Sequence, residues 1–533
     1  MLAWTIYISF LGAGGLMLLP RDSARAARTI ALLVALLGFG FAISGFLESK
    51  SGEIITVAKY SWIPALGINY HLAADGISIT LVLLTGLAAI AGILFSWNIE
   101  HRSKEFFALY LALIGGVYGV FLSFDLFLLF VFYEIAIIPK YFIIAIWGST
   151  RRDYAAMKLA LYSFVGSAMV LVGLIAAYVL AGSKTMSLVE LAKFPFPPSF
   201  QMWAFPLVFV GFAILAGLWP FHTWAPTGHV AAPTAASMLL AGVVMKLGAY
   251  GCLRVAMTIF PQGMDPWTIE KYSPHILNSL GSHSLVQNIQ WLLHLAGFGS
   301  WREVFSLLAV IGIVYGAMVA LVQKDFKFVI GYSSVSHMGF VLLGLMTLNL
   351  TGLNGAVLQM FSHGIIAGLL FAVVGRMVYD RTHTRQLTEL QSLNLNQALP
   401  FAAITFTIAS VASMGLPGFS GFVAELQVIV GAWHFSSNFA VVAGLGILVG
   451  VAYTLRALQQ AFFSEHEPAT TPSTANGHAP LKMEPITVPE RIASVLLIGA
   501  ALVIGLYPRL LLDLISPSFD SSIFEGLRKA GGM

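Results

Sequence analysis

Residues 211–233, GFAILAGLWPFHTWAPTGHVAAP, and residues 413–428, SMGLPGFSGFVAELQV, each carry a proline in the middle of an apolar stretch. Pro220 and Pro417 each remove a helix hydrogen bond and interrupt the helix. An interruption inside a membrane leaves polar backbone that must face protein or water. Two interrupted helices therefore predict two repeated halves with an ion path between them. The alternative is a pair of ordinary kinks, which membrane helices tolerate.

The rest of the chain is also apolar. Of its 533 residues, 58% are hydrophobic and 10% are charged, whereas a soluble domain carries about 25% charged residues. Stretches of about 20 apolar residues recur along the chain, and each is long enough to cross a ~30 Å hydrocarbon core as a helix. We expect Met1 to Leu19 to be such a span, because no basic region precedes it as in a cleavable signal. The fold class is all-α polytopic membrane protein, with about fourteen spans near 2–19, 29–47, 77–97, 105–122, 124–147, 155–181, 203–221, 233–258, 303–322, 328–349, 354–378, 398–433, 438–463 and 490–508.

Lysine and arginine are concentrated in alternate loops, which predicts the orientation. By the positive-inside rule these loops face the cytoplasm and both chain ends face the other side. The residues concerned are Arg21, Arg25, Arg28, Arg102, Lys104, Arg151, Arg152, Lys324, Lys327, Arg381, Arg385, Lys482 and Arg491.

Three stretches are too polar for the membrane. Residues 50–74 mix aromatic residues and threonine with proline and glycine, and predict a hairpin on the outer face. Residues 259–302 predict a long outer loop, in which VQNIQWLLHL is typical of an interfacial amphipathic helix. Residues 464–489 are rich in proline, threonine and alanine, and predict a disordered cytoplasmic loop.

Cysteine content and net charge exclude several functions. Cys252 is the only cysteine, so the chain cannot form an internal disulfide or supply the thiolates of an iron–sulfur cluster. We expect no redox cofactor and no metal on this chain. The net charge of +4 is too small to indicate nucleic-acid binding.

Three ionisable residues lie inside predicted spans, where a charge costs roughly 2.5–3.5 kcal/mol on insertion scales. Glu134, in DLFLLFVFYEIAIIPKYFIIAIW, is a candidate proton carrier; the alternative is a protonated acid that holds a neighbouring helix. Lys246, in SMLLAGVVMKLGAYGCL, can gain and lose a proton when buried; the alternative is a side chain that reaches back to water. Glu425 follows the second interruption and predicts a cation or proton site; the alternative is a cap of the broken helix.

Four histidines add to this polar set. Histidine titrates near neutral pH and can pass a proton through either ring nitrogen, although a single membrane histidine is more often a packed hydrogen-bonding residue. Their number favours a relay, and no pair stands out as haem ligands. They are His222, His229, His337 and His363.

Six segments together resemble one family: FHTWAPTGHVAAPT, MLLAGVVMKLGAYG, DFKFVIGYSSVSHMGFVLLG, QMFSHGIIAGLLF, YDRTHTR and LPGFSGFVAEL. They occur in the order typical of the M subunit (chain 4) of NADH–quinone oxidoreductase, respiratory complex I. The resemblance covers nearly the whole chain. The D subunit of multisubunit cation/proton antiporters is less similar around YDRTHTR and LPGFSGFVAEL.

The resemblance implies fourteen helices and two inverted five-helix repeats, each with one broken helix. The corresponding parts of this chain are 1–122, 105–258, 303–463 and 490–533, separated by the loops 259–302 and 464–489. It also implies an antiporter-like proton channel along Glu134, Lys246, Glu425 and the four histidines. Quinone, NADH or another donor, FMN and iron–sulfur clusters would belong to partner subunits of the complex.

One position departs from the family. The family has a lysine seven residues before the histidine of FHTW, where this chain has Leu215. That lysine ordinarily pairs with the glutamate that matches Glu134. Lys140 stands where the family has an uncharged residue, six residues beyond Glu134, and Pro139 could bend the helix between them. We hypothesise that Lys140 replaces the missing cation.

Other functions remain open from the sequence. A cation/proton antiporter subunit shares the fold and differs in its partners and energy source. A structural spacer of the membrane arm with impaired pumping is favoured by Leu215 and disfavoured by Glu134, Lys246 and Glu425. Related membrane-bound hydrogenases and carbon-dioxide-hydrating complexes use similar subunits, and sodium could replace protons.

Overall fold

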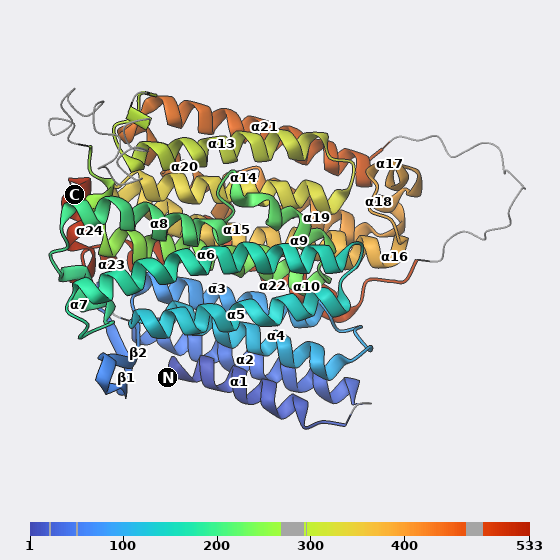
Figure 1. Ribbon diagram of the computed structural model, residues 1–533. Coiled ribbons are helices and arrows are strands. Elements are labelled where there is room, and N and C mark those ends of the chain that lie inside the picture. Colours follow the sequence, from blue (N-terminus) through green and yellow to red (C-terminus); the bar gives the residue numbers. More distant parts are fainter. Residues whose placement is uncertain (21–22, 50–51, 268–292, 295, 465–482, 533) are drawn as a thin grey trace, which may run out of the picture.

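The structure is a computed structural model that describes residues 1–20, 23–49, 52–267, 293–294, 296–464 and 483–532. Long helices run side by side and form one bundle (Figure 1). In the described part, twelve helices are long and apolar enough to cross a membrane, and Ala3–Met17 and Pro400–Ser413 are shorter apolar helices. The predicted all-α polytopic fold is confirmed.

The N-terminal part holds four helices and a hairpin. The two strands pair antiparallel where the sequence predicted a hairpin. Gly67 has a φ of 64° at the turn, and a Cβ there would lie 1.8 Å from the carbonyl oxygen of Lys184, so only glycine fits. The elements are α1 (Ala3–Met17), α2 (Ala24–Glu48), β1 (Ile55–Ile63), η1 (Pro64–Leu66), β2 (Ile68–Ala74), α3 (Gly76–Phe95) and α4 (Ser103–Leu122).

The first interrupted helix lies in the next part. Helix α8 ends at Ala216, Gly217 follows with a φ of 87°, and the chain resumes as α9 after a short 3-10 turn. The interruption predicted at Pro220 is therefore confirmed. The elements are α5 (Leu126–Trp147), α6 (Arg152–Leu180), α7 (Leu188–Lys193), α8 (Pro198–Ala216), η2 (Phe221–Thr223), α9 (Trp224–Ala231), α10 (Thr234–Leu239), the π-helix η3 (Leu240–Val244), α11 (Met245–Gly251), the π-helix η4 (Cys252–Met257) and η5 (Pro261–Met264).

The second interruption separates α19 from α20, where the sequence predicted one span with a break at Pro417. Gly415 and Gly418 both have positive φ in the connecting segment, which confirms the break. The elements are α13 (Trp301–Val322), α14 (Phe326–Met346), α15 (Leu350–Ala372), the π-helix η8 (Val373–Tyr379), α16 (Asp380–Thr382), α17 (Leu387–Leu390), η9 (Gln391–Leu393), α18 (Leu395–Ala398), α19 (Pro400–Ser413), α20 (Ser420–Phe435), α21 (Ser437–Phe462), α22 (Val488–Leu506), α23 (Arg509–Ser518), η10 (Ser522–Phe524) and α24 (Glu525–Gly531).

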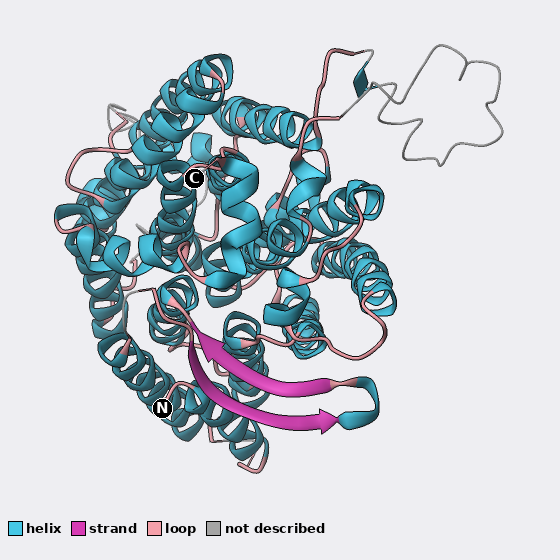
Figure 2. Cartoon of the chain, turned by 90° about the vertical axis from the view of Figure 1, so that its left-hand side faces the viewer, coloured by secondary structure: helices cyan, strands magenta, loops and turns pink. Residues whose placement is uncertain are grey.

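The bundle has two distinct ends. One carries β1, β2 and both termini, and we call it the hairpin end; it faces the viewer in Figure 2. The other carries the loops at 98–102, 148–151, 323–325 and 380–399, and we call it the basic-loop end. At this end Lys104 donates to the carbonyl oxygen of Leu19 (2.9 Å), between α1 and α2, and Arg385 donates to that of Val230 in α9 (3.1 Å). The lysine- and arginine-rich loops thus gather at one end, as the sequence predicted.

The same local structure occurs once at each end. At the hairpin end, Asp125 caps α5 by accepting from the backbone N–H groups two and three residues further on, and a short antiparallel bridge joins it to Ser187, just before α7. At the basic-loop end, Asp325 caps α14 in the same way, and a bridge joins it to Gln386, just before α17. The two halves therefore share a local structure in opposite orientations.

Two predicted segments lie outside the described residues. The amphipathic helix VQNIQWLLHL falls almost wholly in residues 268–292 and 295, and most of the polar loop 464–489 falls in residues 465–482. Neither prediction is tested.

A buried charge cluster fastens α22 to the core. Glu490 is 1% exposed and accepts from Arg376 Nε at 2.6 Å and from Arg381 Nη2 at 2.8 Å. Its side chain also completes the capping box of α22 with Thr487. Removal of the carboxylate would leave Arg381 without its acid and Arg376 with Asp380 alone, at 3.1 Å.

We expect Glu490→Ala to lower the free energy of unfolding by about 3–5 kcal/mol, because it breaks a buried ion pair by removing one partner. Unfolding of the purified protein in a detergent titration would measure this. The control is Glu53→Ala, since Glu53 is exposed on the hairpin end. Equal stability of the two variants would contradict the structural role of the cluster.

Candidate functional site

Lys246 lies at the centre of the bundle and is 0% exposed. Its Nζ lies 2.7 Å from Nδ1 of His363 and also donates to the carbonyl oxygen of Ala241. Ala241 belongs to η3, which precedes the helix of Lys246. A π-helix breaks the regular hydrogen bonding of its neighbours, and here one of its carbonyl oxygens receives the ammonium group.

His363 connects Lys246 to a second histidine. It lies on α15, and its ring centroid is 5.3 Å from that of His337 on α14, with an angle of 31° between the rings. Among the described residues, Nε2 of His363 has no hydrogen-bond partner. The two rings are therefore close enough for a proton to pass between them by a short route.

His337 connects to Glu425. Its Nδ1 lies 2.9 Å from Oε1 of Glu425, and its Nε2 lies 3.2 Å from the hydroxyl of Ser413. Gln359 also donates to Oε1 of Glu425, at 3.1 Å. The structure therefore brings four predicted residues, Lys246, His363, His337 and Glu425, into one continuous polar row.

The second helix interruption places backbone beside this row. A Cβ on Gly415, which has a φ of 76°, would lie 3.0 Å from Oε2 of Glu425. A cavity of about 10 Å³ lies between Glu425, His337, His363 and Ser413. This is about the minimum of roughly 10–15 Å³ that one water molecule needs. The break, the carboxylate and the two rings thus share one small polar space.

His229 and His222 lie in the first half. His229 is 0% exposed, and its ring packs against Phe371 with centroids 5.2 Å apart. His222 lies in the first interruption, with its ring 5.2 Å from that of Tyr315. The side-chain nitrogens of both histidines have no hydrogen-bond partner among the described residues. The structure buries both as predicted but does not join them to the row by direct hydrogen bonds.

Glu134 and Lys140 share helix α5, and the structure does not join them in an ion pair. Lys140 is 1% exposed, and its Nζ has no hydrogen-bond partner in the described part of the chain. One carboxyl oxygen of Glu134 is likewise without a partner there. Leu215 is 1% exposed and packs where α8 meets Gly248 of α11. The hypothesis that Lys140 replaces the missing lysine remains a prediction.

Sequence reasoning missed Gln359 and Ser413. Gln359 is four residues before His363, so the spacing would have placed both on one face of α15. Ser413 ends α19, directly before the second interruption. Gln359 donates to Glu425, and Ser413 contacts His337, the histidine partner of Glu425. Neither residue carries a charge that would have marked it in the sequence.

A buried ion pair at the hairpin end was also missed. Arg254 Nη2 lies 2.6 Å from Oδ1 of Asp75, and both side chains are almost fully buried. Arg254 lies in η4, and its Nε donates to the hydroxyl of Tyr250 at 3.1 Å. Its guanidinium carbon is 5.2 Å from the ring centroids of Phe124 and Phe524. The pair fastens η4 to the start of α3, and the guanidinium also packs against Phe524 of the C-terminal segment.

The row from Lys246 to Glu425 contains groups that exchange protons. Histidine can accept at one ring nitrogen and donate at the other, and a carboxylate can receive the proton at the end. Because the row crosses from the first half of the chain to the second, it can carry a proton between them.

Comparison with known proteins gives concordant results. The family described as NADH:quinone oxidoreductase/Mrp antiporter, TM, matches residues 123–273 and 274–450. NADH-quinone oxidoreductase subunit M of Rhodobacter capsulatus is 35% identical over 508 residues, which cover 93% of this chain and 88% of that one. A chain of respiratory complex I from Thermus thermophilus is 26% identical with a TM-score of 0.82, and all of both chains is covered. A chain of the Mrp complex from Dietzia sp. DQ12-45-1b shares the fold, at 20% identity and a TM-score of 0.79, over 100% of this chain and 99% of that one.

We expect a double-mutant cycle on Lys246→Met and His363→Phe to be non-additive. Each single change leaves the other side chain buried without its partner, so the double variant loses less stability than the sum, by about 0.5–3 kcal/mol. Detergent unfolding of the four proteins measures the coupling. Lys246→Met combined with Arg302→Met is the control, because Arg302 has other partners, the carbonyl oxygens of Met346 and Thr347. Equal additivity of both pairs would contradict the contact.

Proposed function

Because the chain belongs to the NADH:quinone oxidoreductase/Mrp antiporter transmembrane family, we propose that it is a proton-translocating, antiporter-like membrane subunit of a complex I-type NADH–quinone oxidoreductase. A relative named subunit M supports this over nearly its full length. The chain is an integral membrane protein, and its place in the proposed complex is the bacterial inner membrane, next to other antiporter-like subunits.

The buried row Lys246–His363–His337–Glu425 carries the proposal. It spans the two halves of the chain and ends beside an interrupted helix. A subunit that only held others together would not need three proton-exchanging side chains and a lysine in one buried row, because such groups are costly in a membrane. Hydrogen bonds join Lys246 to His363 and His337 to Glu425, and the two histidine rings lie 5.3 Å apart between these pairs.

Protons would enter from the basic-loop end, which faces the cytoplasm, and would reach Lys246 with the help of His229 and His222. They would then pass through His363 and His337 and leave near Glu425. Electrostatic changes that begin where a partner reduces quinone would shift proton affinities along the row. This chain would contribute no redox step; quinone, NADH or another donor, FMN and iron–sulfur clusters belong in this scheme to partner subunits.

The proposal also assigns a role to Glu134 and Lys140 in the first half of the chain. Lys140 is buried and Glu134 is partly buried on the same helix, six residues apart, and no ion pair joins them in the described part of the chain. In this scheme their charges interact without direct contact. Lys140 would thereby supply the positive charge that the family has at the position of Leu215. The two opposite repeats at 105–258 and 303–463, supported by the matching caps at Asp125 and Asp325, would each contain one such acid.

We expect gentle detergent extraction followed by mass spectrometry to find quinone-reductase and iron–sulfur subunits with this chain. The reason is that a complex I subunit is held by its neighbours in the membrane arm. Recovery of other antiporter subunits alone, without redox partners, would instead identify a cation/proton antiporter and overturn the oxidoreductase assignment.

We expect Lys140→Ala to lower the number of protons translocated per electron in vesicles that contain the intact complex. Loss of the ammonium group would leave Glu134 without any nearby cation and shift its proton affinity. Acidification of the vesicle lumen measures the effect. Lys184→Ala is the control, since Lys184 is exposed near the hairpin end. Normal translocation by the Lys140 variant would refute the replacement hypothesis.

A further inference from the structure

A cavity of about 140 Å³ lies at the basic-loop end, between the two halves of the chain. One water molecule needs roughly 10–15 Å³, so the cavity has room for several water molecules. It is lined by the last residues of α3 and α5 and the first residues of α10 and α14. Its polar lining includes Asn98, Ser149, Thr234, Lys327 and Asp380.

Lys327 reaches this cavity from the first turn of α14 and is only 3% exposed. Its Nζ donates to the carbonyl oxygen of Ala232 at 3.1 Å. The acids nearby are engaged elsewhere: Asp325 pairs with Arg385 at 3.3 Å, and Asp380 pairs with Arg376 at 3.1 Å.

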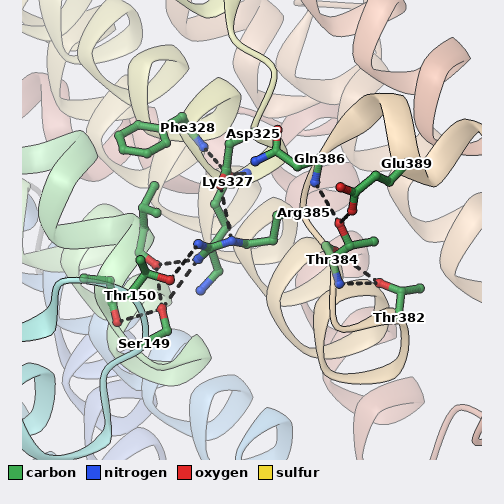
Figure 3. A network of polar contacts seen from close by, with 12 residues as sticks. Ser149, Thr150, Asp325, Lys327, Phe328, Thr382, Thr384, Arg385, Gln386 and Glu389 are labelled. Atoms are coloured by element: carbon green, nitrogen blue, oxygen red, sulfur yellow. Dashed lines mark hydrogen bonds and ion pairs between the residues drawn. The ribbon is translucent and has the colours of Figure 1, made fainter.

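Figure 3 shows how Arg385 keeps Asp325 occupied. Arg385 lies between Asp325 on one side and Ser149 and Thr150 on the other. The carboxylate of Asp325 is further used by the backbone N–H groups that it caps. Within the described part of the chain, Lys327 therefore has no carboxylate at ion-pair distance.

Buried lysines and buried arginines differ throughout the described part of the protein. Each of the three buried arginines forms an ion pair with an acid, whereas none of the three buried lysines does. Arginine cannot release its proton in a protein, but a buried lysine can. The pattern separates fixed charges from charges that can be lost and regained. The arginines are Arg254, Arg376 and Arg381, and the lysines are Lys140, Lys246 and Lys327.

The repeated local structure shows that the fold does not require Lys327. Two residues after Asp325 stands Lys327, but two residues after Asp125 stands Phe127, which packs against Trp62 of the hairpin with ring centroids 5.8 Å apart. The same position is thus closed by aromatic rings at the hairpin end. At the basic-loop end it holds a charge beside a cavity.

A polar link leads from Lys327 inward. The carbonyl oxygen of Ala232 accepts from Lys327 and also from the hydroxyl of Ser237, at 3.1 Å in each case. That hydroxyl also donates to the backbone carbonyl of His229 at 2.7 Å. The cavity therefore lies on the approach to the central row.

We propose that this cavity is the cytoplasmic opening for proton uptake, and that Lys327 is both its first proton carrier and the residue that excludes metal cations. The inference rests on the proposed function. The neutral amine of Lys327 binds a proton that water in the cavity delivers from the cytoplasm. It then releases this proton to water on the His229 side and returns to the neutral amine, so charge moves without a metal cation passing. A sodium ion cannot follow this route, because it would have to pass an ammonium group in a narrow, buried space.

The test uses the intact complex in sealed proteoliposomes, driven by its own electron donor and a short-chain quinone. We expect Lys327→Met to lower proton translocation per electron by as much as Lys246→Met does. Lys327→Arg should cause the same loss, because arginine keeps the charge but cannot release a proton. Lys324→Met is the matched control, since Lys324 lies on the exposed surface of the same loop and should translocate normally. Uptake of sodium-22 should stay at background in the unaltered protein, in Lys327→Arg and in Lys324→Met, and should rise in Lys327→Met, which lacks the ammonium group.

The outcomes distinguish failure of the inference about Lys327 from failure of the proposed function. If Lys246→Met lowers translocation while both Lys327 variants are normal, protons enter elsewhere and the inference about Lys327 is wrong. If Lys327→Met loses translocation but Lys327→Arg retains it, the residue acts as a fixed charge and not as a carrier. Sodium-22 uptake by the unaltered protein, or background uptake by Lys327→Met, would refute the exclusion of metal cations by Lys327. If neither Lys246→Met nor Lys327→Met has an effect, the proposed function itself fails.

Discussion

Lipid offers no hydrogen-bond partner to the backbone, and this constraint governs where the chain can depart from a regular helix. Several of these departures lie beside polar side chains. The segment that interrupts α19 and α20 meets Glu425, and the π-helix η3 gives a carbonyl oxygen to Lys246. Irregular backbone and ionisable side chains thus satisfy each other. The central row exists because each interruption needs a polar neighbour and each buried charge needs a polar backbone group.

The same constraint explains how the buried charges are distributed. Arg254 with Asp75, and Arg376 and Arg381 with Glu490, form closed clusters that hold helices together at the two ends of the bundle. A closed cluster is stable because both charges are buried with a partner, and it is expensive to open. The lysines are placed differently. In the described part of the chain, Lys246 contacts a histidine and a carbonyl oxygen, Lys327 contacts a carbonyl oxygen, and Lys140 has no hydrogen-bond partner. Structural and exchangeable charges are therefore carried by different residue types.

The sequence predicted the spans, the breaks at Pro220 and Pro417 and the buried position of Lys246, because apolar length, proline and isolated charges are local signals. It could not predict the contacts that join Lys246 to His363 and His337 to Glu425, since these residues are far apart in the chain and meet only through packing. The π-helices also escaped, because they depend on tertiary contacts and not on a residue pattern. Lys327 was counted only as a loop charge, since its burial depends on how the two halves meet. The six-residue spacing of Glu134 and Lys140 turns them to different faces of α5, and no ion pair joins them in the described structure; the replacement of the missing lysine by Lys140 stays a prediction.

The matching caps at Asp125 and Asp325 have a consequence for how the protein is made. A helix start that is capped by an aspartate and bridged to a neighbouring segment has the same structure in either orientation. It therefore does not indicate which side of the membrane it faces. During insertion the two halves must nevertheless enter in opposite directions. Lysines and arginines in the loops can direct them: Arg151 and Arg152 stand between α5 and α6 in the first half, and Lys324 and Arg385 stand in the second. The loop charges would thus act as the topogenic signals of a fold whose own elements are ambiguous, and exchanging them between loops would misorient one half without altering any residue of its core.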